Sequence, residues 1–259
     1  MELYAMISGM EEQVHALASQ VRAARAVTVM TGAGVSAASG VPTFRGPEGL
    51  WRTFRPEDLA TPDAFARDPA LVWEWYSWRR ARVASCRPNA AHEVIARWSR
   101  DPARQVRVIT QNVDDLHLRA GTRDLIRLHG SLWETKCFNG CAAGMRPWRD
   151  EEITERGPLP RCPHCGGLAR PAVVWFGESL DADDVERASQ AVSCDVFLTV
   201  GTSAIVYPAA GFARVAQARG AFTAEINLES TPASPLADLS ILGAAEVVLP
   251  SVDQLLATS

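Results

Sequence analysis

The sequence lacks the features of a nucleic-acid-binding protein and of a membrane protein. Lysine and arginine form no block, and the net charge of −4 offers no surface suited to a polyanion. No stretch approaches the roughly 18 consecutive apolar residues of a membrane span. The N-terminal stretch 1–24 is polar and acidic, unlike a signal peptide. Repeats and low-complexity tracts are absent as well. These absences predict a soluble cytoplasmic protein with neither a nucleic-acid nor a membrane partner.

The chain does have enough apolar material for a substantial core, with 47% hydrophobic residues in a length of 259. That length suits one large domain, or one domain that carries smaller insertions. Six cysteines fit a reducing compartment best if most of them have a task other than forming disulfides. Nothing in the sequence decides the oligomeric state, and a monomer is compatible with it.

Short apolar runs of strand length alternate with segments of helix length, which is the pattern of a parallel sheet covered by helices on both faces. The runs are residues 26–31, 106–110, 125–129, 196–201, 221–227 and 246–250. We therefore predict an α/β fold with a doubly wound, Rossmann-like parallel sheet. Residues 51–88 and 133–170 interrupt the alternation, so the sheet domain would be discontinuous and comprise residues 1–50, 89–132 and 171–259.

A glycine-containing loop follows the first predicted strand. In TGAGVSAASG, Gly32, Gly34 and Ala37 satisfy the G-x-G-x-x-G/A spacing of dinucleotide-binding loops. Such a loop brings main-chain N–H groups and a helix N-terminus close to a pyrophosphate; a turn without a ligand would also explain the glycines. The acidic residue that dehydrogenases carry about 20 positions later would fall in a stretch with no strand character. A bound dinucleotide would therefore be held in a different way.

Polar side chains follow two of the other predicted strands. Gln111, Asn112 and Asp114 leave the second strand together, at the sheet edge where α/β proteins bind ligands. These groups suit a sugar hydroxyl and an amide. His117 stands three residues after Asp114, where it could serve the site or merely hydrogen-bond at a helix start. His129 ends the third strand, and its near-neutral pKa suits a proton acceptor; a satisfied core histidine is the alternative.

Four of the cysteines are clustered as a C-x3-C pair and a C-x2-C pair separated by 20 residues. They are Cys137, Cys141, Cys162 and Cys165, and their spacing is close to that of a four-thiolate zinc ribbon. Four thiolates close such a site to water, so the predicted zinc ion is structural. The insertions would then form a smaller domain, with a helical part at 51–88 and a zinc ribbon at 133–170.

The stretch Val72 to Arg80, VWEWYSWRR, concentrates aromatic residues and two adjacent arginines. A packing helix is the first interpretation, and the wall of a pocket is the alternative. Tyr76 and Arg79 are three residues apart and would share one helix face, but Arg80 is also within helical reach of Tyr76. Periodicity alone does not choose between the two arginines.

Six motifs in this order resemble the sirtuins, a family of NAD-dependent protein-lysine deacylases. They are GAGVSAASGVPTFRG, TQNVDDLH, LHGS, VVWFGE, GTSAIVYPA and INLE. The resemblance implies a structural zinc ion, NAD as co-substrate and acylated protein lysines as the other substrate. The oxygen of the acyl-lysine amide would attack the nicotinamide ribose. The products would be nicotinamide, O-acyl-ADP-ribose and free lysine.

The resemblance also implies roles for individual residues. His129 would be the general base that takes a proton from the ribose hydroxyls. Val174, Trp175, Phe176 and Gly177 would form an extended apolar stretch that pairs with the substrate peptide by strand addition; a buried strand end is the alternative. The residues implied in NAD binding are Gly32, Ala33, Gly34, Phe44, Arg45, Gln111, Asn112, Asp114, Gly201, Thr202, Ser203, Asn227, Glu229 and Ala244.

Within the family, the resemblance is to the branch that removes succinyl, malonyl and related acidic acyl groups. That branch carries a tyrosine and an arginine three residues apart over the acyl-lysine channel, which here are Tyr76 and Arg79, and the small Ala60 would leave room for a bulkier acyl end. A guanidinium pairs with both oxygens of a carboxylate, so we expect a preference for acidic acyl groups with weaker deacetylation. The alternatives are a plain deacetylase, a mono-ADP-ribosyltransferase, and an NAD-sensing zinc adaptor without enzyme activity.

Overall fold

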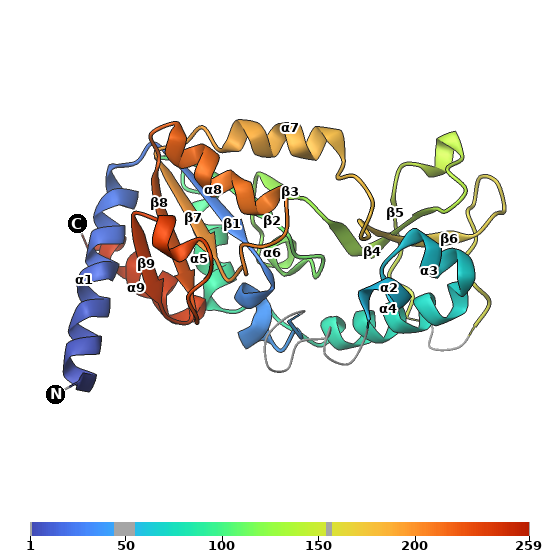
Figure 1. Ribbon diagram of the computed structural model, residues 1–259, viewed down its shortest axis with the longest axis horizontal. Coiled ribbons are helices and arrows are strands. Elements are labelled where there is room, and N and C mark those ends of the chain that lie inside the picture. Colours follow the sequence, from blue (N-terminus) through green and yellow to red (C-terminus); the bar gives the residue numbers. More distant parts are fainter. Residues whose placement is uncertain (1, 44–54, 154–156, 259) are drawn as a thin grey trace.

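A parallel sheet of six strands is the centre of the fold in the computed structural model, which describes residues 2–43, 55–153 and 157–258 (Figure 1). Its strands are β1 (Ala26–Thr31), β2 (Gln105–Thr110), β3 (Leu125–Arg127), β7 (Val196–Val200), β8 (Phe222–Asn227) and β9 (Leu239–Leu242). They have the order β3-β2-β1-β7-β8-β9, and every neighbouring pair is parallel. The strand order reverses between β1 and β7, as in doubly wound folds. The predicted Rossmann-like sheet is confirmed.

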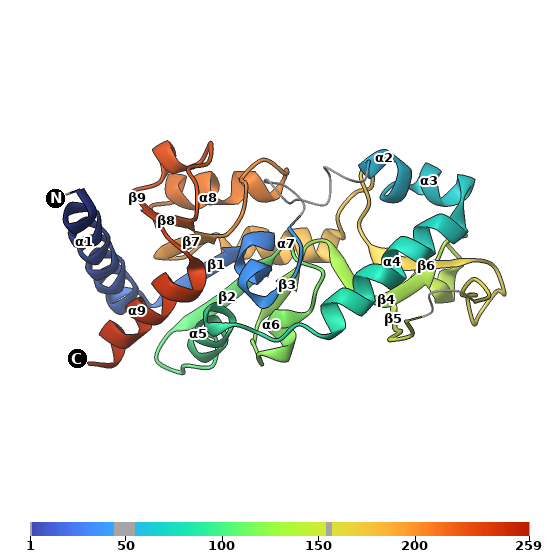
Figure 2. The same ribbon diagram turned by 90° about the horizontal axis from the view of Figure 1, so that it is seen from below.

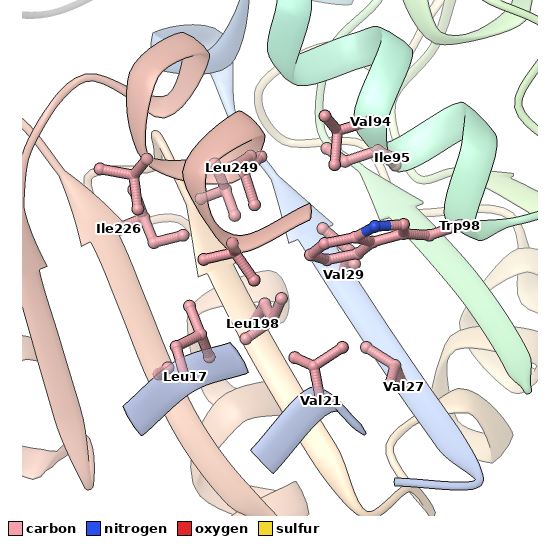
Figure 3. Packing of buried hydrophobic residues seen from close by; sticks show 14 of the residues in the cluster. Leu17, Val21, Val27, Val29, Val94, Ile95, Trp98, Leu198, Ile226 and Leu249 are labelled. Carbon is pink, nitrogen blue, oxygen red and sulfur yellow. The ribbon is translucent and has the colours of Figure 1, made fainter. Parts of the chain in front are cut away.

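Helices cover both faces of this sheet. On one face lie α1 (Glu2–Ala23), α5 (Ala90–Trp98) and α9 (Ala245–Ala257), and on the other lie α7 (Ala182–Ala191) and α8 (Ala209–Ala218). Side chains alternate along a strand, so Val27 and Val29 of β1 face the first group while Met30 faces the second. Figure 3 shows the first face, where Leu17 of α1 and Leu249 of α9 pack over the strands. Within the described ranges, no helix is both long and apolar enough to cross a membrane.

The predicted strand at 246–250 is wrong, because these residues belong to α9. Val248, Leu249 and Val252 are buried, and their spacing is that of one helix face. Pro250 lies inside this helix, although proline usually favours a helix end. The sixth strand is β9 instead, whose sequence LSIL has a single fully buried position.

A second, smaller layer lies at the other end of the molecule, away from α1 and α9 (Figures 1 and 2). Its elements are α2 (Pro56–Leu59), α3 (Pro62–Arg67), α4 (Pro69–Ala84), β4 (Gly130–Cys137), β5 (Trp148–Arg149) and β6 (Ala169–Val173). The three strands form an antiparallel sheet in the order β5-β4-β6, and α4 packs against it. Thr61 and Asp68 cap α3 and α4 by accepting main-chain N–H groups, and a proline follows each cap. The division into a sheet domain and two insertions stays a prediction, and β4 begins before residue 133, where the second insertion was expected to start.

Candidate functional site

Two loops meet at the carboxyl ends of β1 and β7, where the sheet reverses its order. Gly32 N–H donates to Val200 O (3.1 Å), and Gly34 N–H donates to Gly201 O (2.8 Å). A Cβ on Gly34 would lie 2.7 Å from Gly201 O, and Gly201 itself has a φ of 59°. The glycines are therefore needed for contact between the loops. They lie at the edge where open α/β sheets bind ligands, and Gly32 is followed by a 3₁₀ helix, η1 (Ala33–Ser39), rather than an α-helix.

The polar residues after β2 reach both loops. Gln111 Nε2 donates to Thr202 Oγ1 (2.9 Å) after β7, and Asn112 Nδ2 donates to Ser36 Oγ (3.1 Å) in η1. Asp114 is buried, and its Oδ1 accepts a main-chain N–H two residues further on (2.9 Å). Burial raises the pKa of the Asp114 carboxyl, against the lowering effect of that hydrogen bond and of one with Ser36. The structure thus brings together Gln111, Asn112 and Asp114, as their positions after one strand predict.

His129 lies just after β3, in the connection to β4, and is half-buried. Its Nδ1 is 3.0 Å from the carbonyl oxygen of Gln111. A carbonyl oxygen only accepts, so Nδ1 carries the proton and Nε2 keeps its lone pair. Burial lowers the pKa of His129 below its ordinary value of 6.5, and the hydrogen bond to Gln111 opposes that shift. His129 is therefore a neutral imidazole near pH 7 whose Nε2 can accept a proton.

His117 has a different environment from His129. Its side chain is 2% exposed, and its Nε2 lies 2.9 Å from Thr31 Oγ1. The ring of His92 packs against it with a centroid separation of 4.8 Å. Burial lowers the pKa of both histidines, to about 4 for His92. His117 is therefore a buried neutral group whose contact with Thr31 joins the short helix Leu116–Arg119 to β1.

The aromatic stretch 72–80 lies in α4, where some of its side chains pack in the core and others border a pocket. Trp73, Trp75 and Tyr76 are buried, and the Tyr76 hydroxyl accepts the indole N–H of Trp175 (2.8 Å). The guanidinium of Arg79 lies 5.4 Å from the centre of the Tyr76 ring. Arg79 also borders a pocket between α4 and the loops after β1 and β2. The walls of this pocket are Ala33, Val41, Pro42, Trp78, Arg79, Arg82, Val83, Asn112, Val113, Asp114 and Leu132.

The neighbouring Arg80 turns toward β4 instead, and it is 1% exposed. Its Nε donates to Leu132 O (2.7 Å), and its Nη1 donates to Asp150 Oδ2 (3.1 Å) and Glu152 O (2.8 Å). Arg80 thus fixes α4 to the second sheet. The structure therefore distinguishes the two arginines that the sequence left open, because it places Arg79 at the pocket and Arg80 away from it.

The segment 174–177 turns in its second half, so the predicted extended stretch is wrong there. Gly177 has a φ of 85°, and Glu178 N–H donates to Trp175 O (3.0 Å). Trp175 is 2% exposed and packs against Phe65, with 5.5 Å between ring centroids. For this residue the structure matches the alternative interpretation, a buried strand end.

The same segment connects His129 to the helical part of the second layer. Val174 N–H donates to His129 O (3.0 Å), and Phe176 N–H donates to Ala60 O (2.9 Å). Ala60 follows α2 and is buried, whereas Phe176 is 45% exposed. Val174 and Phe176 thus lie between His129 and the segment that carries Ala60.

Of the remaining residues predicted to bind NAD, those that the structure describes lie at the same edge of the sheet. Asn227 ends β8, and its Nδ2 donates to Thr202 O (2.9 Å), which joins the loops after β7 and β8. Ser203, Glu229 and Ala244 lie in the connections after β7, β8 and β9. Phe44 and Arg45 lie outside the described residues.

The four clustered cysteines meet at one point beside the second sheet. Their sulfurs all lie within 4.8 Å of one another, with 3.6 Å between Cys137 and Cys165 and 3.7 Å between Cys141 and Cys162. Four thiolates about 2.3 Å from a tetrahedral zinc ion would be about 3.8 Å apart. A Cβ on Gly144 would lie 2.8 Å from two of the sulfurs, so the turn after Cys141 needs glycine to leave room for them. The cluster fits one structural zinc ion.

Removal of one cysteine is expected to release the metal. Cys162→Ser leaves three thiolates, and the folding of a zinc ribbon depends on the full set. We expect zinc affinity to fall at least about tenfold, together with a lower melting temperature; metal analysis of the gel-filtered protein measures the first. Cys194→Ser is the control, because Cys194 is half-buried beside α7 and the main sheet. Full zinc content in Cys162→Ser would contradict the assignment.

A model of the Sir2 family matches residues 32–208, more than half of the chain. The chain belongs to the Sir2 family. The matched range begins at the first glycine of the loop after β1 and includes His129 and the four cysteines. The predicted membership of the sirtuins is thereby confirmed.

Other Sir2 proteins resemble the chain over most of its length. It is 50% identical over 236 residues to NAD-dependent protein deacylase 2 of Pyrobaculum aerophilum, which covers 90% of this chain and 92% of the relative. It is 47% identical over 234 residues to the mitochondrial NAD-dependent protein deacylase sirtuin-5 of Canis lupus familiaris, which covers 82% of this chain and 75% of the relative. The crystal structure of a Sir2 homologue in complex with NAD is similar with a TM-score of 0.87 at 44% identity, over 94% of this chain and 93% of that one.

Proposed function

We propose that the protein is an NAD-dependent protein-lysine deacylase, which releases nicotinamide, O-acyl-ADP-ribose and free lysine. The observation that carries the proposal is the position of His129, a neutral base at the edge where the loops after β1, β2 and β7 meet. The names of the relatives, NAD-dependent protein deacylases, support the same activity. The solved homologue that holds NAD supports the co-substrate.

The residues at this edge fit a dinucleotide. The glycines at 32, 34 and 201 let the loops after β1 and β7 pack against each other at the point where the strand order reverses. Asn112 and Asp114 border the pocket beside Ala33, so we assign them to the carboxamide end of NAD, with Gln111 at the ribose. We assign the phosphates to Gly201, Thr202 and Ser203, and the adenosine end to Asn227, Glu229 and Ala244.

His129 would act as the general base. NAD supplies the ribose carbon that the acyl-lysine oxygen attacks and the hydroxyl groups that receive the acyl group. Because Nδ1 donates to Gln111 O, the lone pair on Nε2 is the one that can take a proton from a ribose hydroxyl. The same carbonyl would then stabilise the imidazolium. An amide oxygen is a poor nucleophile, so positioning by the surrounding loops must contribute much of the rate.

We further propose that acidic acyl groups are preferred over acetyl groups. Burial lowers the pKa of the Arg79 guanidinium, while Tyr76 and Asp114 oppose that shift. A carboxylate gains most from a buried guanidinium, because water screens the pair least there. Arg82 borders the same pocket on its exposed side. Among the described residues, the walls of this pocket therefore include two arginines, Arg79 and Arg82, and one carboxylate, that of Asp114.

The proposal is tested with NAD and a set of peptides that differ only in the acyl group on one lysine. Mass spectrometry that finds free lysine and O-acyl-ADP-ribose, with succinyl or malonyl peptides turned over faster than acetyl ones, would agree with both parts. Acetyl turnover that is equal or faster would identify a plain deacetylase. ADP-ribose attached to protein would identify a mono-ADP-ribosyltransferase. A protein that binds NAD but consumes none with any peptide would be a zinc adaptor.

A further inference from the structure

Asp115, which directly follows Asp114, is held in a conformation that residues other than glycine rarely adopt. Its φ is 61°, in the left-handed region, and its side chain is 3% exposed. Such a conformation persists only where the surrounding contacts stabilise it. The contacts of Asp115 therefore determine the path of the loop between β2 and α6 (Leu116–Arg119).

Donors from three strands surround the Asp115 carboxylate. Ser131 Oγ on β4 donates to Oδ1 (2.9 Å), and Arg149 Nη1 on β5 donates to Oδ2 (2.8 Å). Arg127 on β3 adds an ion pair, with Nη1 3.5 Å from Oδ1. The carboxylate is buried, so water and salt screen these pairs less than pairs on the surface. Asp115 thus ties the loop after β2 to both sheets.

Strand β4 holds the same loop at two further points. Leu132 N–H donates to Val113 O (2.9 Å), and the indole N–H of Trp133 donates to Asp114 O (3.2 Å). Arg149 is itself placed by β5, which pairs with β4 in the antiparallel sheet. The main chain around Asp114 is therefore hydrogen-bonded to β4 of the second layer. The same strand ends at Cys137, the first of the four zinc ligands.

We infer that Asp115 and Arg149 act together as positioning residues for Asn112 and Asp114, and so set how tightly the enzyme holds the nicotinamide end of NAD. Asn112 and Asp114 line the pocket, whereas Asp115 and Arg149 are not among its lining residues. The inference rests on the proposed function. It adds that residues of the second sheet hold the loop that carries Asn112 and Asp114. A change at Arg149 would reach NAD only through Asp115.

Arg149→Met tests this inference in the full-length zinc-loaded enzyme. The change removes the donor at 2.8 Å and leaves Ser131 in place. We expect KM for NAD to rise about five- to tenfold, as for the loss of a partly exposed charge-assisted hydrogen bond. Inhibition by nicotinamide should weaken to a similar extent, while KM for the acyl peptide stays within about twofold. Amide hydrogen exchange in peptides that cover residues 111–118 should become faster.

Three further variants separate positioning from folding. Glu151→Gln is the matched control, because Glu151 pairs with the other side of Arg149, at Nε (2.8 Å), and is exposed; it should leave KM for NAD unchanged. Arg149→Lys keeps the charge and should recover part of the loss. Asp115→Ala should raise KM for NAD more than Arg149→Met does, because it removes all three contacts of the carboxylate and not only the one with Arg149.

The outcomes distinguish this inference from the proposed function. An active parent enzyme with an Arg149→Met variant whose KM for NAD and loop exchange are unchanged would overturn the inference alone. A lower melting temperature without a change in KM would also overturn it, because the pair would then stabilise only the fold. A parent protein that consumes no NAD with any acyl peptide would overturn both.

Discussion

His129→Ala is expected to lower deacylation of every acyl peptide by about two to four orders of magnitude. The hydrogen bond from Nδ1 to Gln111 O leaves Nε2 as the acceptor, and alanine removes it. The same change leaves intact the glycine contacts that bring the loops after β1 and β7 together. NAD affinity, measured by calorimetry, should therefore stay within about threefold of the parent value.

The pH dependence of the parent enzyme gives a second measurement on the same group. Burial lowers the pKa of His129 below its ordinary value of 6.5. A general base must be unprotonated, so activity is complete above the lowered pKa and is lost as the pH falls through it. The acidic limb of kcat/KM should therefore lie below pH 6.5. A limb above that value would contradict a buried neutral imidazole.

His15→Ala is the control for both measurements, because His15 is an exposed residue of α1. It should change neither the rate nor the position of the acidic limb. If His129→Ala kept more than about a tenth of the parental rate, His129 would not be the general base.

The central sheet could be predicted because its strands are buried on both faces. Residues 26–31 and 196–201 are mostly apolar and almost completely buried, which is what helices on both sides of a strand require. The run at 246–250 has a similar short apolar centre, and only its continuation to Val252 shows the period of a helix. The strand that takes its place, β9, is short and half polar, so its sequence gives little strand signal.

The candidate site could be predicted where one loop carries several of its residues. Gln111, Asn112 and Asp114 follow one strand, and the cysteine pairs have a recognisable spacing. Ser36 and Asp115 were missed although both lie inside the quoted motifs. The partner of Ser36 is Asn112, 76 residues away, and a partner of Asp115 is Arg149, 34 residues away. Such contacts depend on how the elements pack, which no local pattern encodes.

The choice between Arg79 and Arg80 has the same physical origin. Both residues lie within helical reach of Tyr76, so the period of α4 permits either one at the pocket. The position of β4 decides, because its Leu132 carbonyl and the Asp150 carboxylate just after β5 accept hydrogen bonds from Arg80. The environments of Arg79 and Arg80 therefore differ only once α4 has packed against the second sheet.

Arg79→Met is expected to remove the preference for acidic acyl groups. Methionine keeps much of the apolar length of arginine but has no charge, so a succinyl or malonyl carboxylate would enter the pocket without its partner. We expect kcat/KM on the succinyl peptide to lose about 2–4 kcal/mol, roughly 30- to 1,000-fold. The acetyl peptide should change by less than about threefold, since an acetyl group has no carboxylate to bind. Parallel steady-state assays of the two peptides measure both values.

Arg82→Met is the matched control for Arg79→Met. Arg82 borders the same pocket one helical turn further on but is exposed, so its charge is screened and its loss should cost the succinyl peptide only about threefold. Arg80→Met tests a different property. Arg80 is buried and donates hydrogen bonds to the second sheet, so its replacement should lower the melting temperature and reduce both activities together.

The ratio of the two activities isolates the role of Arg79 from every other effect of the substitution. A loss of folded enzyme, of zinc or of NAD affinity lowers the succinyl and acetyl rates by the same factor and cancels in the ratio. Only a group that interacts with the end of the acyl chain changes one rate without the other, because the two peptides share every other contact with the enzyme and with NAD. An unchanged ratio in Arg79→Met would therefore refute the assignment of Arg79 even if both rates fell.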